Sequence, residues 1–387
     1  MYNPDNMKIR KPLFRILILS IALIWIAYPF AEASQDKTEY RKIIEKEFEA
    51  PLGGAFQLAA KYGEVKIMTW SEPRIEIETI ITVDACNEED ANRTFERIRI
   101  EFEQAQDIVR ARTVIDDESF SFKSLFRRCQ VSFTIDYQVH IPATHTLNLK
   151  NKYGNTIVAE LDGDASIDVE YGDLRIDRVG GALTLNLAYG NGTAGKAGSK
   201  LAATISYGKF RAIESGDVTV VSKYSTFGID HCNLLTSSSK YDHIEARTVK
   251  KFSNTSKYSH IRLDSAGAVT LQAEYTDVRI DNVAESLVAA MRYGGLEVSS
   301  LSHDFRVVTL SGKYTGFEIR VARDVSFQVE ATASNGGLSF PASLIVTHQL
   351  EDNGQKSVKG YQKGTHSEVE RVIRADIEYG SFELTSL

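Results

Sequence analysis

Apolar and polar residues alternate along the second half of the chain, and the alternation restarts about every 17 or 18 residues. Leucines fill every second position from Leu183 to Leu187, directly before Tyr189. Past a tyrosine, apolar residues stand three and five positions on, as Leu174 and Ile176 do after Tyr171. A period of two is typical of a strand with one buried face and one exposed face. Each repeat therefore predicts a strand, a turn, a second strand and a second turn.

A tyrosine marks each repeat, and the residue after it is Gly, Ser, Asp or Thr, which favours a tight turn. Asn335 to Phe340 is a degenerate copy with Asn in place of Tyr, and Tyr379 to Leu384 is a terminal copy. Because so short a repeat cannot bury its apolar face alone, we expect the copies to stack. The tyrosines would then form an aromatic ladder that sets the packing period, which leaves the other outward residues to carry function. The marking tyrosines are Tyr153, Tyr171, Tyr189, Tyr207, Tyr224, Tyr241, Tyr258, Tyr275, Tyr293 and Tyr314.

The repeats predict an all-β fold, a parallel β-solenoid (β-helix) of 17- to 18-residue coils, over residues 146–387. An antiparallel meander with two strands per repeat would have the same period, and the pattern alone leaves it open. We favour the solenoid because insertions are rare and the turns stay short. The polar stretch 347–367 is expected to form a long exposed hairpin or loop.

Residues 34–145 differ in kind and predict a small N-terminal α+β cap that covers the open edge of the first coil. The region holds one copy-like element, Lys61 to Ile67. A helix is indicated after Asn87, which is a good N-cap residue and precedes three acidic residues in the first turn. The predicted strands are Arg74 to Val83, around Arg99 to Phe102, and Cys129 to Ile141.

Residues 1–33 are interpreted as a signal peptide. A basic segment from Lys8 to Arg15 precedes the apolar run Ile16 to Tyr28, and Ala31 to Ala33 fits a small-x-small cleavage motif. The run is short for a hydrocarbon core of about 30 Å. The alternative is an uncleaved anchor with its aromatic residues at the membrane interface. We predict export to the periplasm, the cell surface or the exterior.

The net charge bears on the class of partner, and the cysteine content bears on the class of fold. The net charge of −7 gives no general attraction for nucleic acid. Three cysteines are too few for a disulfide scaffold. Cys86 and Cys129 could pair in an oxidising compartment, while Cys232 is expected as a small buried apolar residue.

The order of these features resembles the bacterial putative adhesin domains of unknown function found in exported proteins. The resemblance rests on the signal peptide, the strand-helix-strand cap, Tyr137 to Pro142, the repeated Tyr-Gly units and the final Glu378 to Leu384. It covers most of the chain after the signal peptide. It implies a β-solenoid in an exported surface or periplasmic protein with an adhesion or scaffold role, and no catalytic residues. Ser, Asp and Thr replace Gly after the central tyrosines, so the turns there are not expected to share one backbone geometry.

Gly190 to Gly195 match the GxGxxG pattern of dinucleotide-binding loops. That fingerprint needs a strand before it and the N-terminus of a helix after it. Here the segment lies in register with the repeat and no amphipathic helix follows. We therefore predict no nucleotide site and no cofactor.

Two histidines, His243 and His260, stand two residues past their tyrosines and would stack one strand spacing apart. Such a pair could hold a transition metal, with His231 and Asp242 as further ligands. Exposed turn histidines are common, however, and the same ladder supplies no third ligand. The pattern does not lead us to predict a metal site.

Aspartates six residues past their tyrosines raise calcium as a second candidate metal. The glycine-rich nonapeptide of calcium β-rolls is absent, and Asp is a common turn residue. We therefore predict no calcium site. The aspartates are Asp177, Asp230, Asp264 and Asp281, with Asp162-Gly163-Asp164 in a turn.

Polysaccharide lyases and hydrolases also use β-helices, and they need clustered carboxylates or an arginine base on an outward face. Here arginines and glutamates share one outward row, which is more simply a solvated ladder of charges. We expect an exported, non-enzymatic adhesin-like or scaffold protein that binds an unknown protein or glycan, with no catalytic, cofactor or metal residues. The alternative is a carbohydrate-active lyase or hydrolase. The row contains Arg175, Arg211, Glu245, Arg262, Arg279, Glu297 and Glu318.

Overall fold

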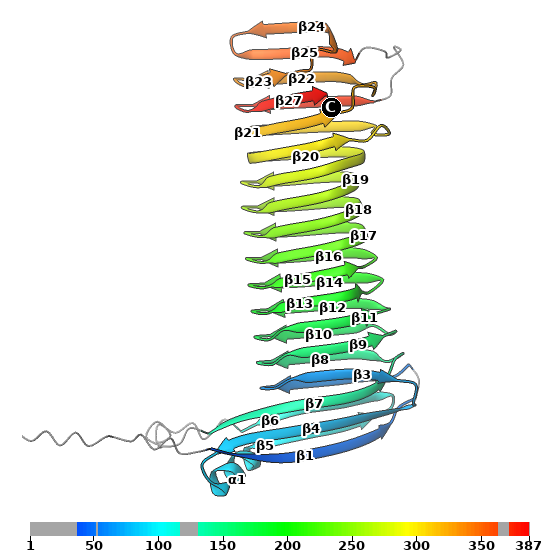
Figure 1. Ribbon diagram of the computed structural model, residues 1–387, viewed down its shortest axis with the longest axis vertical. Coiled ribbons are helices and arrows are strands. Elements are labelled where there is room, and N and C mark those ends of the chain that lie inside the picture. The colour runs from blue at the N-terminus through cyan, green and yellow to red at the C-terminus, as the bar shows by residue number, and fades with distance from the viewer. Residues whose placement is uncertain (1–36, 52, 117–130, 363–370, 387) are drawn as a thin grey trace, which may run out of the picture. The chain divides into compact units, whose positions relative to one another are not determined.

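The computed structural model describes residues 37–51, 53–116, 131–362 and 371–386. Within them the repeats wind into stacked coils, and each strand pairs in parallel with its equivalent one coil away (Figure 1). Strand β10 (Ala165–Glu170), for example, pairs with β8 (Thr146–Lys152) and with β12 (Ala182–Ala188). The predicted parallel β-solenoid is confirmed, and the antiparallel meander is wrong.

Two strands form most coils, but β17 to β20 each run through the second corner of their coil as one strand. The remaining coil strands are β2 (Ala55–Lys61), β3 (Val65–Trp70), β9 (Thr156–Leu161), β11 (Leu174–Val179), β13 (Asn191–Ala197), β14 (Lys200–Ser206), β15 (Lys209–Glu214), β16 (Asp217–Lys223), β17 (Thr226–Lys240), β18 (His243–Lys257), β19 (His260–Glu274), β20 (Asp277–Leu301), β21 (Val307–Val321), β22 (Gln328–Ser334), β23 (Gly337–Ser339), β26 (Val372–Glu378) and β27 (Ser381–Ser386).

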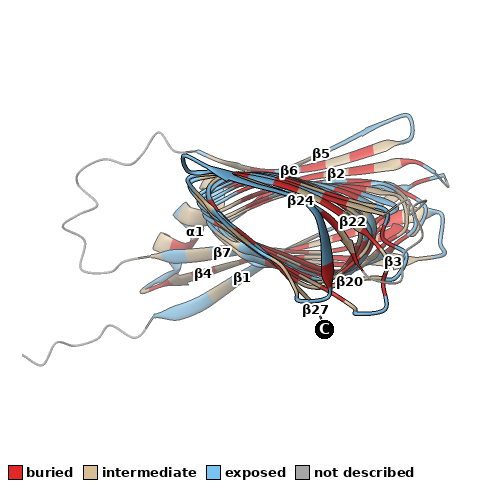
Figure 2. Ribbon diagram, turned by 90° about the horizontal axis from the view of Figure 1, so that it is seen from above, coloured by how far each residue is buried: buried red, intermediate tan, exposed pale blue. Residues whose placement is uncertain are grey.

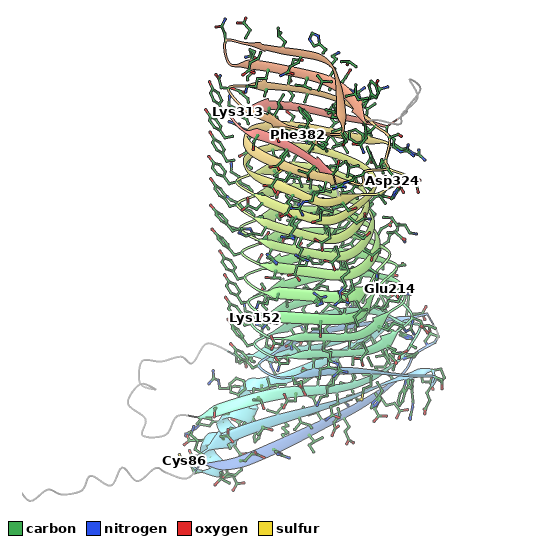
Figure 3. All side chains as sticks on the ribbon, turned by 45° about the horizontal axis from the view of Figure 1, so that its top comes forward. Cys86, Lys152, Glu214, Lys313, Asp324 and Phe382 are labelled. Atoms are coloured by element: carbon green, nitrogen blue, oxygen red, sulfur yellow. The ribbon has the colours of Figure 1, made fainter. Side chains whose placement is uncertain are left out.

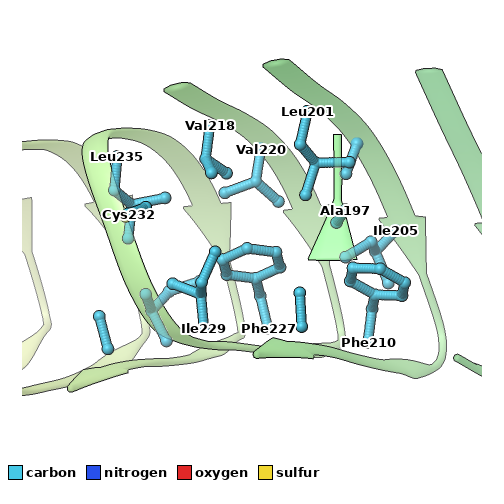
Figure 4. Close-up of a cluster of buried hydrophobic side chains, with 14 of the residues drawn as sticks. Ala197, Leu201, Ile205, Phe210, Val218, Val220, Phe227, Ile229, Cys232 and Leu235 are labelled. Atoms are coloured by element: carbon cyan, nitrogen blue, oxygen red, sulfur yellow. The ribbon is translucent and has the colours of Figure 1, made fainter. Parts of the chain in front are cut away.

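The core lies inside the coils, because alternate residues of both strands are buried (Figure 2). Equivalent residues of successive coils stack there. Phe210 and Phe227, for instance, are fully buried, with ring centroids 6.3 Å apart (Figure 4). Burial of apolar side chains from both strands is therefore the main favourable term that holds neighbouring coils together.

The tyrosine itself makes the turn at the first corner. All twelve ladder tyrosines of the described chain have φ between 49° and 64°, and Asn335 has φ 52°. This left-handed conformation is unfavourable for a bulky residue and is best tolerated by Gly and Asn. The sequence pattern predicted the turn at the residue after the tyrosine, and the structure has it one residue earlier, at the tyrosine itself.

A glycine after the tyrosine allows close approach between coils. Four early coils have glycine at this position, and we call these positions the glycine corners (Gly154, Gly172, Gly190 and Gly208). A Cβ added at any of them would lie 1.8–2.1 Å from the carbonyl oxygen of the equivalent glycine one coil earlier. No side chain fits at that distance. These glycines are required by contact between backbones and not by a positive φ.

The next four coils carry a side chain at the same place, at Ser225, Asp242, Ser259 and Thr276, which we call the polar corners. These side chains are buried and each accepts from the backbone N–H of the preceding corner. The donor–acceptor distances are 3.5 Å for Gly208 N to Ser225 Oγ, 2.8 Å for Ser225 N to Asp242 Oδ1, 3.3 Å for Asp242 N to Ser259 Oγ, and 3.3 Å for Ser259 N to Thr276 Oγ1.

The N-terminal region forms a cap on the first coil, which β2 and β3 build and in which Tyr62 stacks on Tyr153. The predicted helix is confirmed as α1 (Glu88–Arg97), where Asn87 Oδ1 accepts from the N–H of Asp90 at 2.9 Å. Two strands of the cap, β1 and β6, were not predicted. The cap strands are β1 (Thr38–Glu49), β4 (Arg74–Ala85), β5 (Ile98–Ala105), β6 (Ile108–Ile115) and β7 (Ser132–Pro142).

The last coil in sequence is not the last coil in the stack. Strand β26 pairs in parallel with β21 on one side and with β22 on the other. The coil of Tyr379 therefore lies between the coils of Tyr314 and Asn335. The prediction of a terminal copy is right for the chain order and wrong for the spatial order.

The polar stretch 347–367 is a hairpin over its described part, as predicted. It consists of β24 (Leu344–Asp352) and β25 (Gln355–Gln362), and β25 also pairs antiparallel with β22. The hairpin therefore extends the sheet beyond the last coil.

Several sequence predictions fall on residues outside the described ranges. These are the signal peptide, Cys129 and the end of the polar stretch. Cys86 takes part in a disulfide, and Cys232 is free and buried, as predicted for Cys232. Within the described ranges, no helix has the length and apolarity needed to cross a membrane.

Candidate functional site

The tyrosine ladder is an exposed surface feature. Its rings stack with centroids 4.7–5.2 Å apart and planes within 1–18° of parallel. Each tyrosine is 37–49% exposed. Figure 3 shows the rings as a column along one side of the coils, with Lys152 labelled near one end and Lys313 near the other. The expected ladder exists, but the tyrosines are themselves outward residues and belong to the candidate surface.

Stacking decides which part of each tyrosine a ligand can reach. Because neighbouring rings lie about 5 Å apart, both faces of an inner ring are covered by other rings. The ring edges and phenolic hydroxyls remain accessible. No hydrogen bond of a ladder hydroxyl is found within the described part of the chain, whereas the buried Tyr137 hydroxyl bonds Thr113 Oγ1 at 2.7 Å. The ladder thus presents a line of phenolic groups that can donate and accept hydrogen bonds.

A row of long charged side chains runs beside the ladder, at the residue directly before most of the tyrosines. The ammonium groups lie close to the rings: Lys223 Nζ is 5.3 Å from the Tyr224 centroid, and Lys240 Nζ is 5.4 Å from the Tyr241 centroid. Such distances permit a cation–π attraction. The row therefore places positive charge next to the phenolic hydroxyls.

Carboxylates neutralise this row near both ends. Lys152 Nζ lies 2.8 Å from Glu170, and Lys313 Nζ lies 2.6 Å from Glu378. The hydrogen bond to the carboxylate raises the pKa of each lysine above its ordinary value. These lysines stay charged, and their charge is matched locally.

A groove of about 1030 Å³ follows the row over the later coils. Small uncharged polar side chains line it, including Ser238, Thr255 and Gln272. Charged residues of both signs also line it: Lys240, Lys257, Arg292, Lys313, Glu274, Asp376 and Glu378. The groove offers hydroxyl and amide groups beside ammonium groups. This combination suits a polar, extended ligand more than an apolar one.

The Arg–Glu row on the other side of the ladder is a network of ion pairs. Arg279 Nη1 lies 3.3 Å from Glu297, and Arg211 Nη1 lies 3.5 Å from Glu245. The four aspartates considered for calcium join the same network. Asp230 and Asp281, for example, each contact two arginines. The row is therefore a ladder of paired charges, as its sequence indicated.

The histidine pair is brought together but is not arranged around a metal. His243 and His260 are in register, with ring centroids 6.4 Å apart. His243 Nε2 bonds Glu245 at 2.8 Å, and Asp242 is buried at its corner. No group of three candidate ligands that could hold a metal ion occurs among the described residues.

The GxGxxG segment lies in β13, which pairs in parallel with β11 and β15. Strand β14 follows it in the chain, where a dinucleotide-binding loop would have a helix. Its central glycine has a packing role, because a Cβ on Gly192 would lie 2.7 Å from Cδ2 of the buried Phe210.

Burial shifts the pKa values of Cys232 and Asp242, among other groups. Burial raises the pKa of the Cys232 thiol to about 12, so this thiol is neutral and unreactive at pH 7. Burial also raises the pKa of Asp242, against hydrogen bonds from Ser222 Oγ and from two backbone N–H groups. Both groups lie within the stack of coils.

No protein-family profile and no curated protein matches the chain. Several solved structures match the chain, and three of them share 9% sequence identity with it. A "putative cell adhesion protein" of Clostridium sporogenes covers 91% of this chain and 100% of its own, with a TM-score of 0.17. A "putative lipid binding protein" of Parabacteroides distasonis covers 89% and 96%, with a TM-score of 0.23. A "putative adhesin" of Bacteroides fragilis covers 89% and 97%, with a TM-score of 0.20. These TM-scores are too low to support an inference about function.

Proposed function

We propose that this protein is an exported, non-enzymatic binding protein of the cell envelope, adhesin-like or scaffolding, which uses its repeat surface to hold a protein or glycan partner. The observation that carries the proposal is the exposed tyrosine ladder. It places identical hydrogen-bonding groups at regular intervals of about 5 Å along the coils.

The conformation of the tyrosines supports a role beyond packing. A non-glycine residue in the left-handed region costs roughly 1–2 kcal/mol. Ring stacking contributes about 0.5–1.5 kcal/mol per pair. The two terms nearly cancel, and a glycine would turn the corner without the cost. The exposed phenolic edges are then the property that tyrosine adds.

Export is proposed from the basic and apolar pattern of residues 1–33. An exported protein would meet its partner in the periplasm or outside the cell. Extended polymers are abundant in both places, and a ladder of equivalent groups can bind them at many registers.

The alternative is a carbohydrate-active enzyme. Its candidate residues are the outward arginines and glutamates, which pair with one another across coils. Paired charges in a regular ladder favour a structural role for these residues. Catalysis would need a carboxylate pair or an arginine directed at one bond.

The two functions separate in one experiment. The purified full-length protein is incubated with a panel of soluble polysaccharides and with cross-linked envelope fractions, and both retention and new reducing ends are measured. We expect a retained partner and no increase in reducing ends with time. Reducing ends that increase in proportion to protein concentration would overturn the proposal in favour of the enzyme.

A further inference from the structure

The charged row beside the ladder is unbalanced in the middle of the stack. Lys223, Lys240 and Lys257 follow one another in register on β16, β17 and β18. Lys257 pairs with Glu274 at 2.8 Å. For Lys223 and Lys240 no ion pair is found in the part of the chain that the structure describes. Lys152 and Lys313 also have carboxylate partners, whereas Lys223 and Lys240 are adjacent in the row and have none among the described residues.

This arrangement opposes folding. Like charges directly opposite each other on neighbouring strands are destabilising. Two ammonium groups at equivalent positions of neighbouring strands repel each other even in water. The cation–π contacts with Tyr224 and Tyr241 offset part of this repulsion. An anionic ligand would remove the remainder.

The surroundings indicate the rest of the ligand. Ser238 and Thr255 line the groove together with Lys240. Tyr224 and Tyr241, which follow the two lysines in the chain, are exposed. These groups match sugar hydroxyls, which donate and accept hydrogen bonds. A chain that carries both hydroxyls and regularly spaced anionic groups would use the whole surface.

Nucleic acid fits the surface less well. Proteins bind single strands by stacking bases on aromatic faces, and here the ring faces are covered by other rings. The net charge of −7 also repels a uniformly charged polyanion over the rest of the surface.

We propose that Lys223 and Lys240, with the adjoining tyrosine hydroxyls and groove, form a subsite for an acidic polysaccharide. The acidic groups contact the ammonium groups, and the sugar hydroxyls contact Ser238, Thr255 and the phenolic edges. This inference rests on the proposed binding function and specifies its ligand.

The test compares dextran sulfate with dextran, which has the same backbone without the charge, and adds a polyuronate and a nucleic acid. Binding of the full-length protein to dextran sulfate, dextran, polygalacturonate and an oligothymidylate is measured by affinity electrophoresis at low and high salt. The test variant is Lys223→Gln with Lys240→Gln. The matched control is Lys250→Gln with Lys251→Gln, which removes the same charge from exposed lysines away from the ladder.

We expect the wild type to bind dextran sulfate and polygalacturonate but not dextran, with weaker binding at high salt. The test variant should lose roughly tenfold in affinity, because each exposed charged contact contributes up to about 1 kcal/mol. The control variant should bind as the wild type does.

Other outcomes overturn the inference in distinguishable ways. Equal binding to dextran and dextran sulfate, unaffected by the test variant, would overturn the acidic ligand and leave the binding function in place. Preference for the oligothymidylate would identify nucleic acid as the ligand. Binding to no polymer would overturn the acidic subsite, and the cross-linking experiment would then decide the binding function.

Discussion

The glycine corners and the polar corners build the same ladder from different backbone contacts. The tyrosines before the glycine corners have φ of 55–64°, and those before the polar corners have φ of 49–60°. Ring spacing is also the same in the two regions. The glycine corners reach this geometry by direct contact between backbones, whereas the polar corners reach it through buried side chains.

The acceptors of the backbone N–H groups at the corners also differ along the stack. At two glycine corners the N–H two residues past the tyrosine donates to an exposed side chain one coil earlier, as when Asn191 N donates to Asp173 Oδ1 at 2.8 Å. At the polar corners the equivalent N–H of His243 donates to the carbonyl oxygen of Ser225 at 2.9 Å. Glycine corners and polar corners thus provide acceptors for their backbone N–H groups with different residues, whereas the exposed tyrosine is common to both.

The largest effect is expected where a side chain is added to a glycine corner. In Gly190→Ala the new Cβ would lie 1.9 Å from the carbonyl oxygen of Gly172, so neighbouring coils must separate. We expect the free energy of unfolding to fall by about 3 kcal/mol or more. Urea denaturation followed by far-UV circular dichroism would measure it.

Gly295→Ala is the matched control, because its new Cβ meets no atom closer than 3.7 Å. The free energy of unfolding should change by less than about 1 kcal/mol. If both variants were equally stable, close backbone approach would not be the reason for glycine at these corners.

Removal of the carboxylate at a polar corner should have the next largest effect. Asp242→Ala leaves the buried N–H groups of Ser225 and Lys240 without their acceptor. We expect a loss of about 2 kcal/mol in the free energy of unfolding, and a smaller loss for Asp242→Ser, which copies the neighbouring corners. Native-state hydrogen exchange at these two amides would report it, and unchanged protection in Asp242→Ala would contradict it.

A smaller effect is expected for the equivalent change at a glycine corner. Asp173→Ala removes the acceptor of the Asn191 N–H, but Asp173 is exposed and water can replace its carboxylate. We expect a loss of about 0.5 kcal/mol, measured by the same denaturation experiment. A loss as large as that of Asp242→Ala would show that burial does not separate the two kinds of corner.

Much of this fold could be predicted because its signal is periodic. The spacing of the tyrosines fixed the coil length, and the N-cap at Asn87 placed the helix. The order of the last coils could not be predicted, because Tyr379 and Asn335 carry equivalent motifs and only pairing in space distinguishes their positions.

The candidate site was predicted only in part. The alternation of Arg and Glu indicated paired charges, and the structure confirms the pairs. The tyrosines were interpreted mainly as the packing period of the coils, because ring stacking alone accounts for a repeated aromatic residue. A signal existed in the lysines before Tyr224, Tyr241 and Tyr258, since a charged neighbour to an invariant aromatic residue marks an exposed corner.

The smallest effect is expected in the pH dependence of stability, to which the buried carboxyl group of Asp242 contributes. Burial raises the pKa of Asp242 in the folded protein above its ordinary value. The protonated form is therefore favoured by folding, and this residue's contribution to stability rises as pH falls through the raised pKa toward the ordinary one. The stability of the wild type relative to Asp242→Ser should increase as pH falls from 7 toward 4. A difference that stays flat or decreases would contradict the assignment.

The ladder's role in binding is tested most directly by deletion of its hydroxyls. Replacement of Tyr224, Tyr241 and Tyr258 by Phe keeps ring stacking and removes three phenolic groups. We predict a free energy of unfolding within about 1 kcal/mol of the wild type and an affinity for dextran sulfate that is roughly tenfold weaker, measured by titration calorimetry. An unchanged affinity in a fully folded variant would contradict the ladder as the binding surface.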